Sequence, residues 1–468
     1  MELLQAISRQ VASGSAGDAA AGLHALMLSN KFLKGAILAE TSVKEHYEFL
    51  QPLIGAFKAL KPHLPIREIN SQMLALMGPK QRQEQVTAVL GLADGGDKAE
   101  AIAGLGAGLA HLSEPQREDL VAAALGLARE RHKAEAIAGL GAGLAHLSES
   151  QRENLVAAAL GLDDENHKAE AIAGLGAGLA HLSESQREEL VTAALRLNGW
   201  DKAQAIAGLG AGLAHLSESQ REELVTAALD LVYDDYKAQA LAGLGAGLAH
   251  LSESQREELV TAALGLADER HKIRAIVGLG AGLAHLSESQ REELVTAALD
   301  LTDEWHKSMA IAGLGPGLAA LERPQQQVLV TAALGLADGE DKAQAIAGLG
   351  AGLAALERSQ QEALVTAVLR LADDDYKAQA IAGLGAGLAA LEGSQQQALV
   401  KAALGLAVGW HKSMAIVGLG AGLAALDGTQ QQALVKAALG LADGWHKAEA
   451  IVGLVNGYQA SRVRDYLR

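Results

Sequence analysis

The chain of 468 residues contains no cysteine. This absence excludes disulfide bonds, thiolate nucleophiles and cysteine-ligated metal sites. Aromatic residues make up only 3% of the sequence and proline occurs seven times, whereas hydrophobic residues as a whole reach 49% and are mostly Ala and Leu. This composition is typical of tightly packed helices and not of a β-sandwich or barrel core.

Long apolar segments and an excess of positive charge are also missing. Stretches such as Ala101 to Ala110 end within about a dozen residues, which is too short to span a bilayer. The start, MELLQAISRQ, lacks the pattern of a secretory signal peptide. A formal net charge of −17 weighs against binding to duplex DNA. We therefore expect a cytoplasmic protein without membrane contact; delivery into a host cell by a bacterial secretion system stays open.

The sequence does contain extensive internal repetition. A tag of the form A-[IL]-[AV]-G-L-[GV] recurs eleven times from Ala101 to Ala450, in steps of 35 residues and once of 34, between Ala171 and Ala205. A twelfth, degenerate copy precedes the first tag. A fixed period of this length indicates a repeat array, in which each copy buries its apolar face against its neighbours.

Each copy contains the pattern of two helices. In the first, Ile102, Leu105 and Leu109 form one apolar stripe. The second follows a capping box, Ser113 to Gln116, and most first helices follow an Asp suited to the N-cap. The sequence predicts an all-α fold, a right-handed α-solenoid superhelix of about 11–12 two-helix repeats with helical caps.

Four segments differ in character. Residues 1–65 form a predicted N-terminal helical cap, interrupted near Gly14 and Glu40 and containing the phenylalanines Phe32, Phe49 and Phe57. Residues 66–309 form an acidic solenoid block, residues 310–454 a near-neutral one, and residues 455–468 a capping helix. Pro316 replaces the usual Ala at the block boundary, where we expect a kink and an irregular stack up to about Pro324.

Variation between copies is confined to the three residues before a recurring lysine. All four tryptophans lie there, and a constant frame with one variable edge is how repeat proteins build a recognition surface. The competing interpretation is a tolerant loop. The predicted partner-binding edge comprises Arg131, His132, Asn166, His167, Trp200, Asp201, Asp235, Tyr236, Arg270, His271, Trp305, His306, Glu340, Asp341, Asp375, Tyr376, Trp410, His411, Trp445 and His446. The lysine ladder comprises Lys133, Lys168, Lys202, Lys237, Lys272, Lys307, Lys342, Lys377, Lys412 and Lys447.

No catalytic constellation stands apart from the repeats, so we expect no enzyme activity and no cofactor. The string G-L-G-A-G-L-A recurs within helices, unlike a nucleotide-binding loop. Six histidines from His111 to His285 recur one per copy, too far apart to share a metal ion. The favoured function is a scaffold for a protein or peptide, with basic features facing the acidic N-terminal half. The alternative is a nucleic-acid reader that binds one base per copy.

The motif A-x-A-[IL]-x-x-L-x-x-x-L-x-x-L, followed by a helix ending A-L-x-L-A-D, resembles the Ala/Leu-rich, HEAT- and TPR-like repeats of bacterial α-solenoid proteins from about Ile66 to Leu454. This resemblance implies an interaction scaffold. The chain is more loosely similar to TAL effectors and pentatricopeptide proteins, which read one base per two-helix repeat. In TAL repeats a lysine faces phosphate, and Lys133 and its equivalents match it by position, whereas the repeat body differs.

Overall fold

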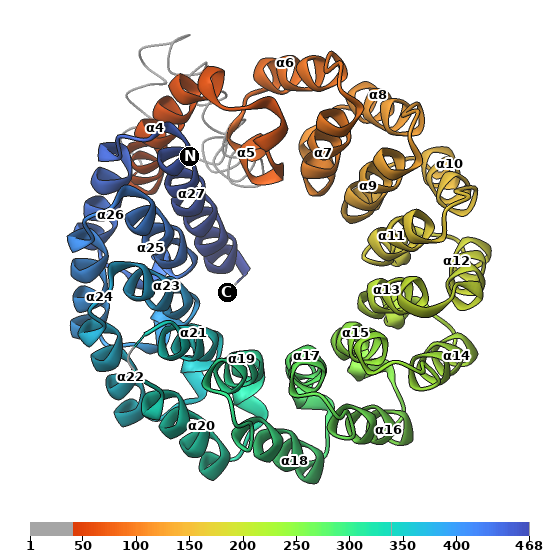
Figure 1. The fold of residues 1–468 in the computed structure, drawn as a ribbon. Coiled ribbons are helices and arrows are strands. Elements are labelled where there is room, and N and C mark those ends of the chain that lie inside the picture. The colour runs from red at the N-terminus through yellow and green to blue at the C-terminus, as the bar shows by residue number, and fades with distance from the viewer. Residues whose placement is uncertain (1–40, 338, 468) are drawn as a thin grey trace.

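The computed structural model describes residues 41–467 except Asp338, and this part of the chain is helical without any strand. The helices form two concentric layers of a ring (Figure 1). The inner layer comprises α5 (Ser71–Leu76), α7 (Gly95–Leu105), α9 (Glu130–Leu140), α11 (Glu165–Gly176), α13 (Gly199–Leu209), α15 (Asp234–Leu244), α17 (Glu269–Gly280), α19 (Glu304–Leu314), α21 (Glu340–Leu349), α23 (Asp374–Leu384), α25 (Gly409–Ala421) and α27 (Gly444–Leu467). The prediction of an all-α solenoid of two-helix repeats is confirmed.

The outer layer holds the second helix of each copy, antiparallel to the first. It comprises α6 (Pro79–Leu90), α8 (Glu114–Leu125), α10 (Glu149–Leu160), α12 (Glu184–Arg196), α14 (Glu218–Leu229), α16 (Glu253–Leu264), α18 (Glu288–Leu299), α20 (Arg323–Gly335), α22 (Arg358–Arg370), α24 (Gly393–Gly405) and α26 (Gly428–Gly440). Between the layers, the repeated Leu, Ile, Val and Ala side chains form one continuous core.

The first helix of each copy is shorter than its apolar stripe suggests. It ends near the second glycine of the tag, and the chain continues as a tighter 3-10 turn: η3 (Gly106–His111), η4 (Gly141–His146), η5 (Leu179–His181), η6 (Gly210–His215), η7 (Gly245–His250), η8 (Leu283–His285), η9 (Gly315–Ala320), η10 (Gly350–Ala355), η11 (Gly385–Ala390) and η12 (Leu423–Ala425). Pro316 lies in the first turn of η9, where the α-helix has already ended at Leu314. The α-helix is therefore not kinked by this proline. The backbone angles at Gly315 match those of the other copies, so the expectation of a kink was wrong. The irregular stacking expected up to about Pro324 stays a prediction.

A polar side chain of the following outer helix donates hydrogen bonds to the carbonyls of each 3-10 turn. In the acidic block an arginine does this: the guanidinium of Arg256 donates to the carbonyls of Leu248 and Leu251 at 3.5 and 2.5 Å. In the near-neutral block the equivalent Gln361 amide donates to both corresponding carbonyls, at 2.9 and 3.1 Å. The change of pattern between the blocks thus preserves the hydrogen bonds while removing one positive charge per copy.

Consecutive inner helices touch through their backbones. A Cβ atom placed on Gly139 would lie 2.2 Å from the Cα of Ala103 in the preceding copy, and Gly174 meets Ala138 at the same distance. Where Val277 replaces that alanine, the distance at Gly313 grows to 2.6 Å. Small residues therefore narrow each copy on its inner side, while larger Leu and Val side chains fill the outer side. The resulting wedge shape bends the stack.

The bend brings the two ends of the described chain together. Helix α4 (Thr41–Leu60), which leads through the short turns η1 (Lys61–His63) and η2 (Ile66–Glu68) into α5, packs against α26 and α27 (Figure 1). The ring of Phe49 stacks on that of Tyr458, with centroids 4.2 Å apart, and Leu53 and Phe57 are fully buried beside it. The phenylalanines of the N-terminal cap thus join the C-terminal helix; Phe32 and the predicted break near Gly14 lie outside the described residues.

Candidate functional site

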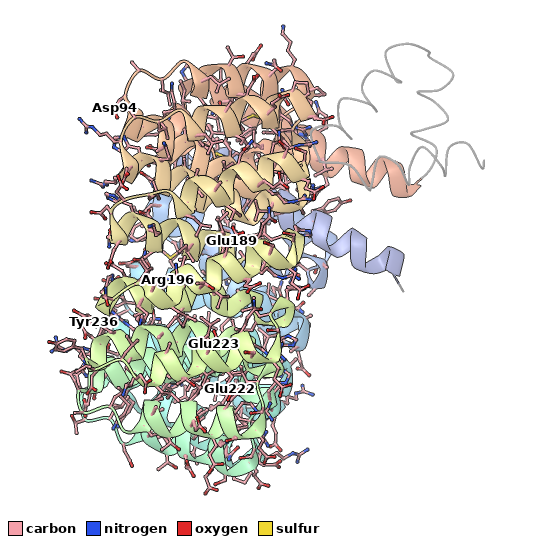
Figure 2. The ribbon with its side chains drawn as sticks, turned by 90° about the vertical axis from the view of Figure 1, so that its right-hand side faces the viewer. Asp94, Glu189, Arg196, Glu222, Glu223 and Tyr236 are labelled. Carbon is pink, nitrogen blue, oxygen red and sulfur yellow. The ribbon has the colours of Figure 1, made fainter. Side chains whose placement is uncertain are left out.

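The variable turns of all copies lie on one rim of the ring, which we call the turn rim: the last residues of each outer helix, the turn, and the first residues of the next inner helix. Figure 2 shows Asp94 and Tyr236 on this rim, while the end of α27 projects from the opposite one. Predicted N-cap residues anchor the turns, as in Asp94, whose carboxylate accepts from the backbone N–H groups of Gly96 and Asp97. These bonds lower the pKa of Asp94.

The first of the three variable residues links neighbouring copies. The carboxylate of Glu130 accepts from the backbone N–H groups of Asp163 and Asp164 in the next turn, at 3.1 Å each. Bonds to Asp164 and then Asp163 lower the pKa of Glu130. Acids at equivalent positions repeat this contact: Asp234 to Ala267, Glu269 to Thr302, Glu304 to Ala337 and Asp374 to Ala407. This structural role was not predicted, although an acid at that position in six of the eleven copies was the available signal.

The third variable residue, directly before the lysine, also faces the preceding copy. The side chains of His132, His271, His306 and His411 are partly buried in the turn rim. The Nδ1 atom of His306 lies 3.3 Å from a carboxylate oxygen of Glu269. A Cβ atom on Gly95 would lie only 2.9 Å from Nδ1 of His132. Half of the predicted edge therefore contributes to packing between copies as well as to the surface.

The middle variable residue is the one that points outward. Arg131, Asn166, Arg270 and Glu340 are exposed, as are Trp200, Trp305 and Trp410, whereas Asp235, Asp375 and Trp445 are half-buried. Trp305 exposes 49% of its surface. The structure thus divides the predicted edge into an outward row and a row that packs between copies.

Exposed apolar side chains collect on the turn rim. Nine large apolar residues are exposed in the described part of the chain, and six of them lie in these turns: Trp200, Val232, Tyr233, Trp305, Val408 and Trp410. The predicted edge did not include Val232, Tyr233 or Val408, because each precedes the three variable residues. An apolar or aromatic residue where most copies have Ala or Asp was the missed signal.

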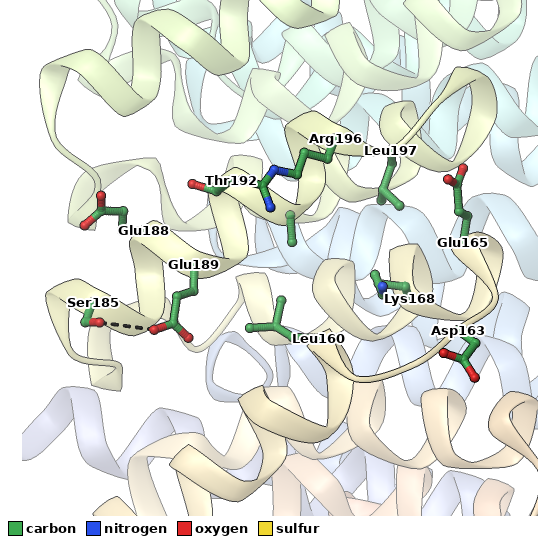
Figure 3. Close-up of a pocket in the computed structure, with 11 residues that line it drawn as sticks. Leu160, Asp163, Glu165, Lys168, Ser185, Glu188, Glu189, Thr192, Arg196 and Leu197 are labelled. Atoms are coloured by element: carbon green, nitrogen blue, oxygen red, sulfur yellow. Dashed lines mark hydrogen bonds between the residues drawn. The ribbon is translucent and has the colours of Figure 1, made fainter.

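Two lysines of the ladder line grooves that extend from the turns onto the outer surface. Lys168 lines a groove between α10 and α12 on the outer surface, with a volume of about 620 Å³, together with Glu165, Glu189 and Arg196 (Figure 3). Lys202 lines the next groove, of about 590 Å³, with Glu222, Glu223 and Asp230. Figure 2 shows Glu189, Arg196, Glu222 and Glu223 on the outer wall of the ring. These two lysines thus line outer grooves together with carboxylates.

On the inner helices, the residue two positions after the lysine is polar in every copy except those with Met309 and Met414. Burial, and then repulsion from Glu135, raise the pKa of Glu170, and burial raises that of Glu449. Further along the chain, the amide of Gln379 donates to the side-chain oxygen of Gln344. The histidines from His146 to His285 are exposed at the opposite rim, and the described residues contain no group able to hold a metal ion.

No protein-family model matches the chain, and a comparison with curated proteins finds no match either. Among solved structures the chain is similar to the karyopherin Kap121p, at 12% identity and a TM-score of 0.37, covering 92% of this chain and 49% of that one. Importin beta gives 14% and 0.33, covering 85% and 61%; Kap95p, solved with RanGDP, gives 14% and 0.40, covering 96% and 66%. The chain thus spans about half the length of Kap121p.

Stacked pairs of antiparallel helices are the HEAT-like arrangement that the repeat pattern predicted. The likeness to TAL-effector and pentatricopeptide arrays stays a prediction. No helix in the described range has the length and apolar character needed to cross a membrane.

Proposed function

We propose that this protein is a non-catalytic scaffold that binds a protein or peptide partner along the turn rim. The observation that carries the proposal is that six of the nine large exposed apolar side chains in the described part of the chain, including three tryptophans, lie on this one rim. Exposed apolar groups that collect on one side of a protein mark interaction sites, and Trp and Tyr dominate the energetics of such sites.

The rigid support of the turns strengthens the proposal. Most of the turns are fixed by an N-cap or by a carboxylate from the preceding copy, as in the bonds from Asp163 and Asp164 to Glu130. Side chains mounted on ordered turns lose little entropy on binding. Basic features of the partner would face the acidic block, where the outer wall carries the paired Glu222 and Glu223.

The alternative of a nucleic-acid reader requires lysines that follow a phosphate backbone beside the aromatic residues. Lys168 and Lys202 instead line grooves on the outer wall among carboxylates. A phosphate chain on the turn rim would meet the acids of the N-caps before it met these lysines. This placement favours a protein partner.

The test is the double substitution Trp305→Ala with Trp410→Ala. A partner is first captured with the wild-type chain and identified by mass spectrometry, and its affinity is then measured with purified components by calorimetry. Each tryptophan that acts as a binding hot spot contributes about 2 kcal/mol or more, so the double variant should bind at least about 100-fold more weakly. Circular dichroism and melting temperature should stay nearly unchanged.

The matched control is Val328→Ala. Val328 is 47% exposed, close to the 49% of Trp305, but lies on the outer helix α20. This variant should bind like the wild type. Full binding by the tryptophan variant, or a collapse of its melting temperature, would exclude the turn rim as the binding surface. Recovery of nucleic acid instead of a protein, seen as a raised 260/280 nm absorbance ratio, would support the alternative.

A further inference from the structure

One turn on the rim differs from all others. The copy that ends at Asn198 is the one shortened to 34 residues, and Gly199, which follows it, has a φ of +51°, the only left-handed φ in the described part of the chain. Glycine adopts this conformation without steric cost, whereas other residues rarely do. A Cβ atom on Gly199 would also lie 3.2 Å from the ring of Tyr236. The shortened turn therefore brings the start of α13 against the aromatic residues of the next copy.

Three aromatic rings meet at this turn. The Trp200 and Tyr236 rings lie with their centroids 6.0 Å apart and their planes at 66°, and Tyr233 lies 5.2 Å from Tyr236 at 67°. Trp200 is 36% exposed and Tyr233 is 64% exposed. Edge-to-face contacts of this kind hold the rings in place while leaving part of their faces open to solvent.

Three carboxylates that neighbour these aromatic residues in sequence are held in fixed positions by hydrogen bonds. Asp201 accepts from the amide of Asn166 at 3.2 Å. Asp234 accepts from the backbone N–H of Ala267 at 3.0 Å, and Asp235 from that of Tyr236 at 2.9 Å. Negative charge beside electron-rich ring faces attracts cations and disfavours anions.

The chain itself places a cation on one of these rings. The guanidinium carbon of Arg274, on α17 two copies further along, lies 5.9 Å from the centroid of the Trp200 ring. This is within the range of a cation–π interaction. The equivalent position holds Glu, Gln or Met in every other copy from Glu100 to Glu449, so this arginine is specific to the copy that reaches Trp200.

We propose that Trp200, Tyr233 and Tyr236 form a binding site for an arginine side chain of the partner, which takes the place of Arg274 on the Trp200 ring. The assignment rests on the proposed function, because the partner must lie along the turn rim to present that side chain. Arginine fits better than lysine: its planar guanidinium stacks on aromatic faces and can form two parallel hydrogen bonds to one carboxylate.

The test uses the full chain labelled with 5-fluorotryptophan. Its four tryptophans give four fluorine NMR signals, each assigned by a single Trp→Phe substitution. The probe is the blocked tripeptide Gly-Arg-Gly, compared with the same peptide containing lysine or the neutral isostere citrulline. The Trp200 signal should shift and saturate with the arginine peptide, shift several-fold more weakly with lysine and stay in place with citrulline. Tyr233→Ala should weaken the arginine response about fivefold, as expected for loss of one cation–π contact.

Two further variants complete the design. Tyr376→Ala is the matched control, because Tyr376 stands in the same D-D-Y-K motif, whereas Asp373 takes the position of Tyr233 and Glu340 of the preceding copy takes that of Trp200. It should leave the Trp200 response unchanged. Arg274→Gln introduces the residue found at this position in α15, Gln239, and should strengthen the response because the resident guanidinium no longer competes.

A Trp200 signal that responds equally to citrulline or to lysine would overturn the proposal, as would no response at all or no gain with Arg274→Gln. Such a failure is distinguishable from failure of the proposed function. The variant carrying Trp305→Ala and Trp410→Ala leaves the Trp200 cluster intact, so its loss of partner binding reports on the rim independently.

Discussion

Replacing Gly174 by alanine should destabilise the ring, although this change normally stabilises a helix. Gly174 lies inside α11, where alanine is more favourable than glycine by about 0.5–1 kcal/mol. A Cβ atom at this position would lie 2.2 Å from the Cα of Ala138 and 2.6 Å from its carbonyl oxygen. A rotamer change cannot relieve contacts with backbone atoms, so α9 and α11 must move apart.

The expected net loss is about 2 kcal/mol. Overpacking a core costs about 1–3 kcal/mol, and obstruction by backbone places this site at the upper end, from which the gain in helix propensity is subtracted. Because repeat arrays open locally, the assay is hydrogen exchange of α9 and α11 together with guanidinium unfolding. The control is Gly405→Ala, at the end of α24, where no atom lies within 4 Å and stability should be unchanged or slightly higher. A Gly174→Ala variant as stable as the wild type would refute the close backbone approach of the inner helices.

Two other predictions concern the closing contact and the inner row of glutamates. Phe49→Ala removes a buried ring that stacks on Tyr458, and loss of such a ring from a core costs about 3–5 kcal/mol. Hydrogen exchange in α4 should therefore accelerate, and the radius of gyration measured by X-ray scattering should rise. Unchanged exchange in α4 would contradict closure through this stack. Burial and the neighbouring Glu135 raise the pKa of Glu170, so its ionised form disfavours the folded state as the pH rises above the ordinary glutamate pKa. Glu170→Gln should therefore raise the melting temperature at neutral pH and lose this advantage near about pH 3, where both side chains are neutral; an advantage that persists there would point to a cause other than charge.

The repeated part of the fold could be predicted from the sequence because each copy contains the same apolar spacing and the same helix-capping residues. Apolar spacing places residues such as Ile102 and Leu109 in the core, and both are fully buried. The predicted capping box at Ser113 is present, with its backbone N–H donating to Gln116 at 2.8 Å. Most predicted aspartate N-caps also accept the expected backbone bonds, while Asp338 lies outside the described residues.

Closure of the ring could not be predicted in the same way. Closure depends on the small bend angle between successive copies, which contacts such as Gly139 against Ala103 determine. The sum of these angles over the whole array determines whether the two ends meet. A sequence pattern records that small residues are present but not the angle that they produce. The contact between Phe49 and Tyr458, more than 400 positions apart in sequence, follows from that sum.

The candidate site was predicted in outline, and its internal division was not. Sequence variation identified the turns, but it could not separate the outward Trp305 from the neighbouring His306, which faces Glu269 of the preceding copy. The aromatic cluster was missed for a related reason. The step of 34 residues between Ala171 and Ala205 is visible in the sequence, but the pattern does not show that this turn brings Trp200 against Tyr236.

An open solenoid can gain or lose a copy at modest cost, because its ends remain ends whatever its length. A ring has no such freedom. Once α4 covers α26 and α27, an added copy would drive these helices past one another and a deleted copy would leave them short of contact. Such arrays grow by duplication of repeats, and closure of the ring prevents a further duplication here. The number of copies is therefore as fixed a property of this protein as the residues in its core.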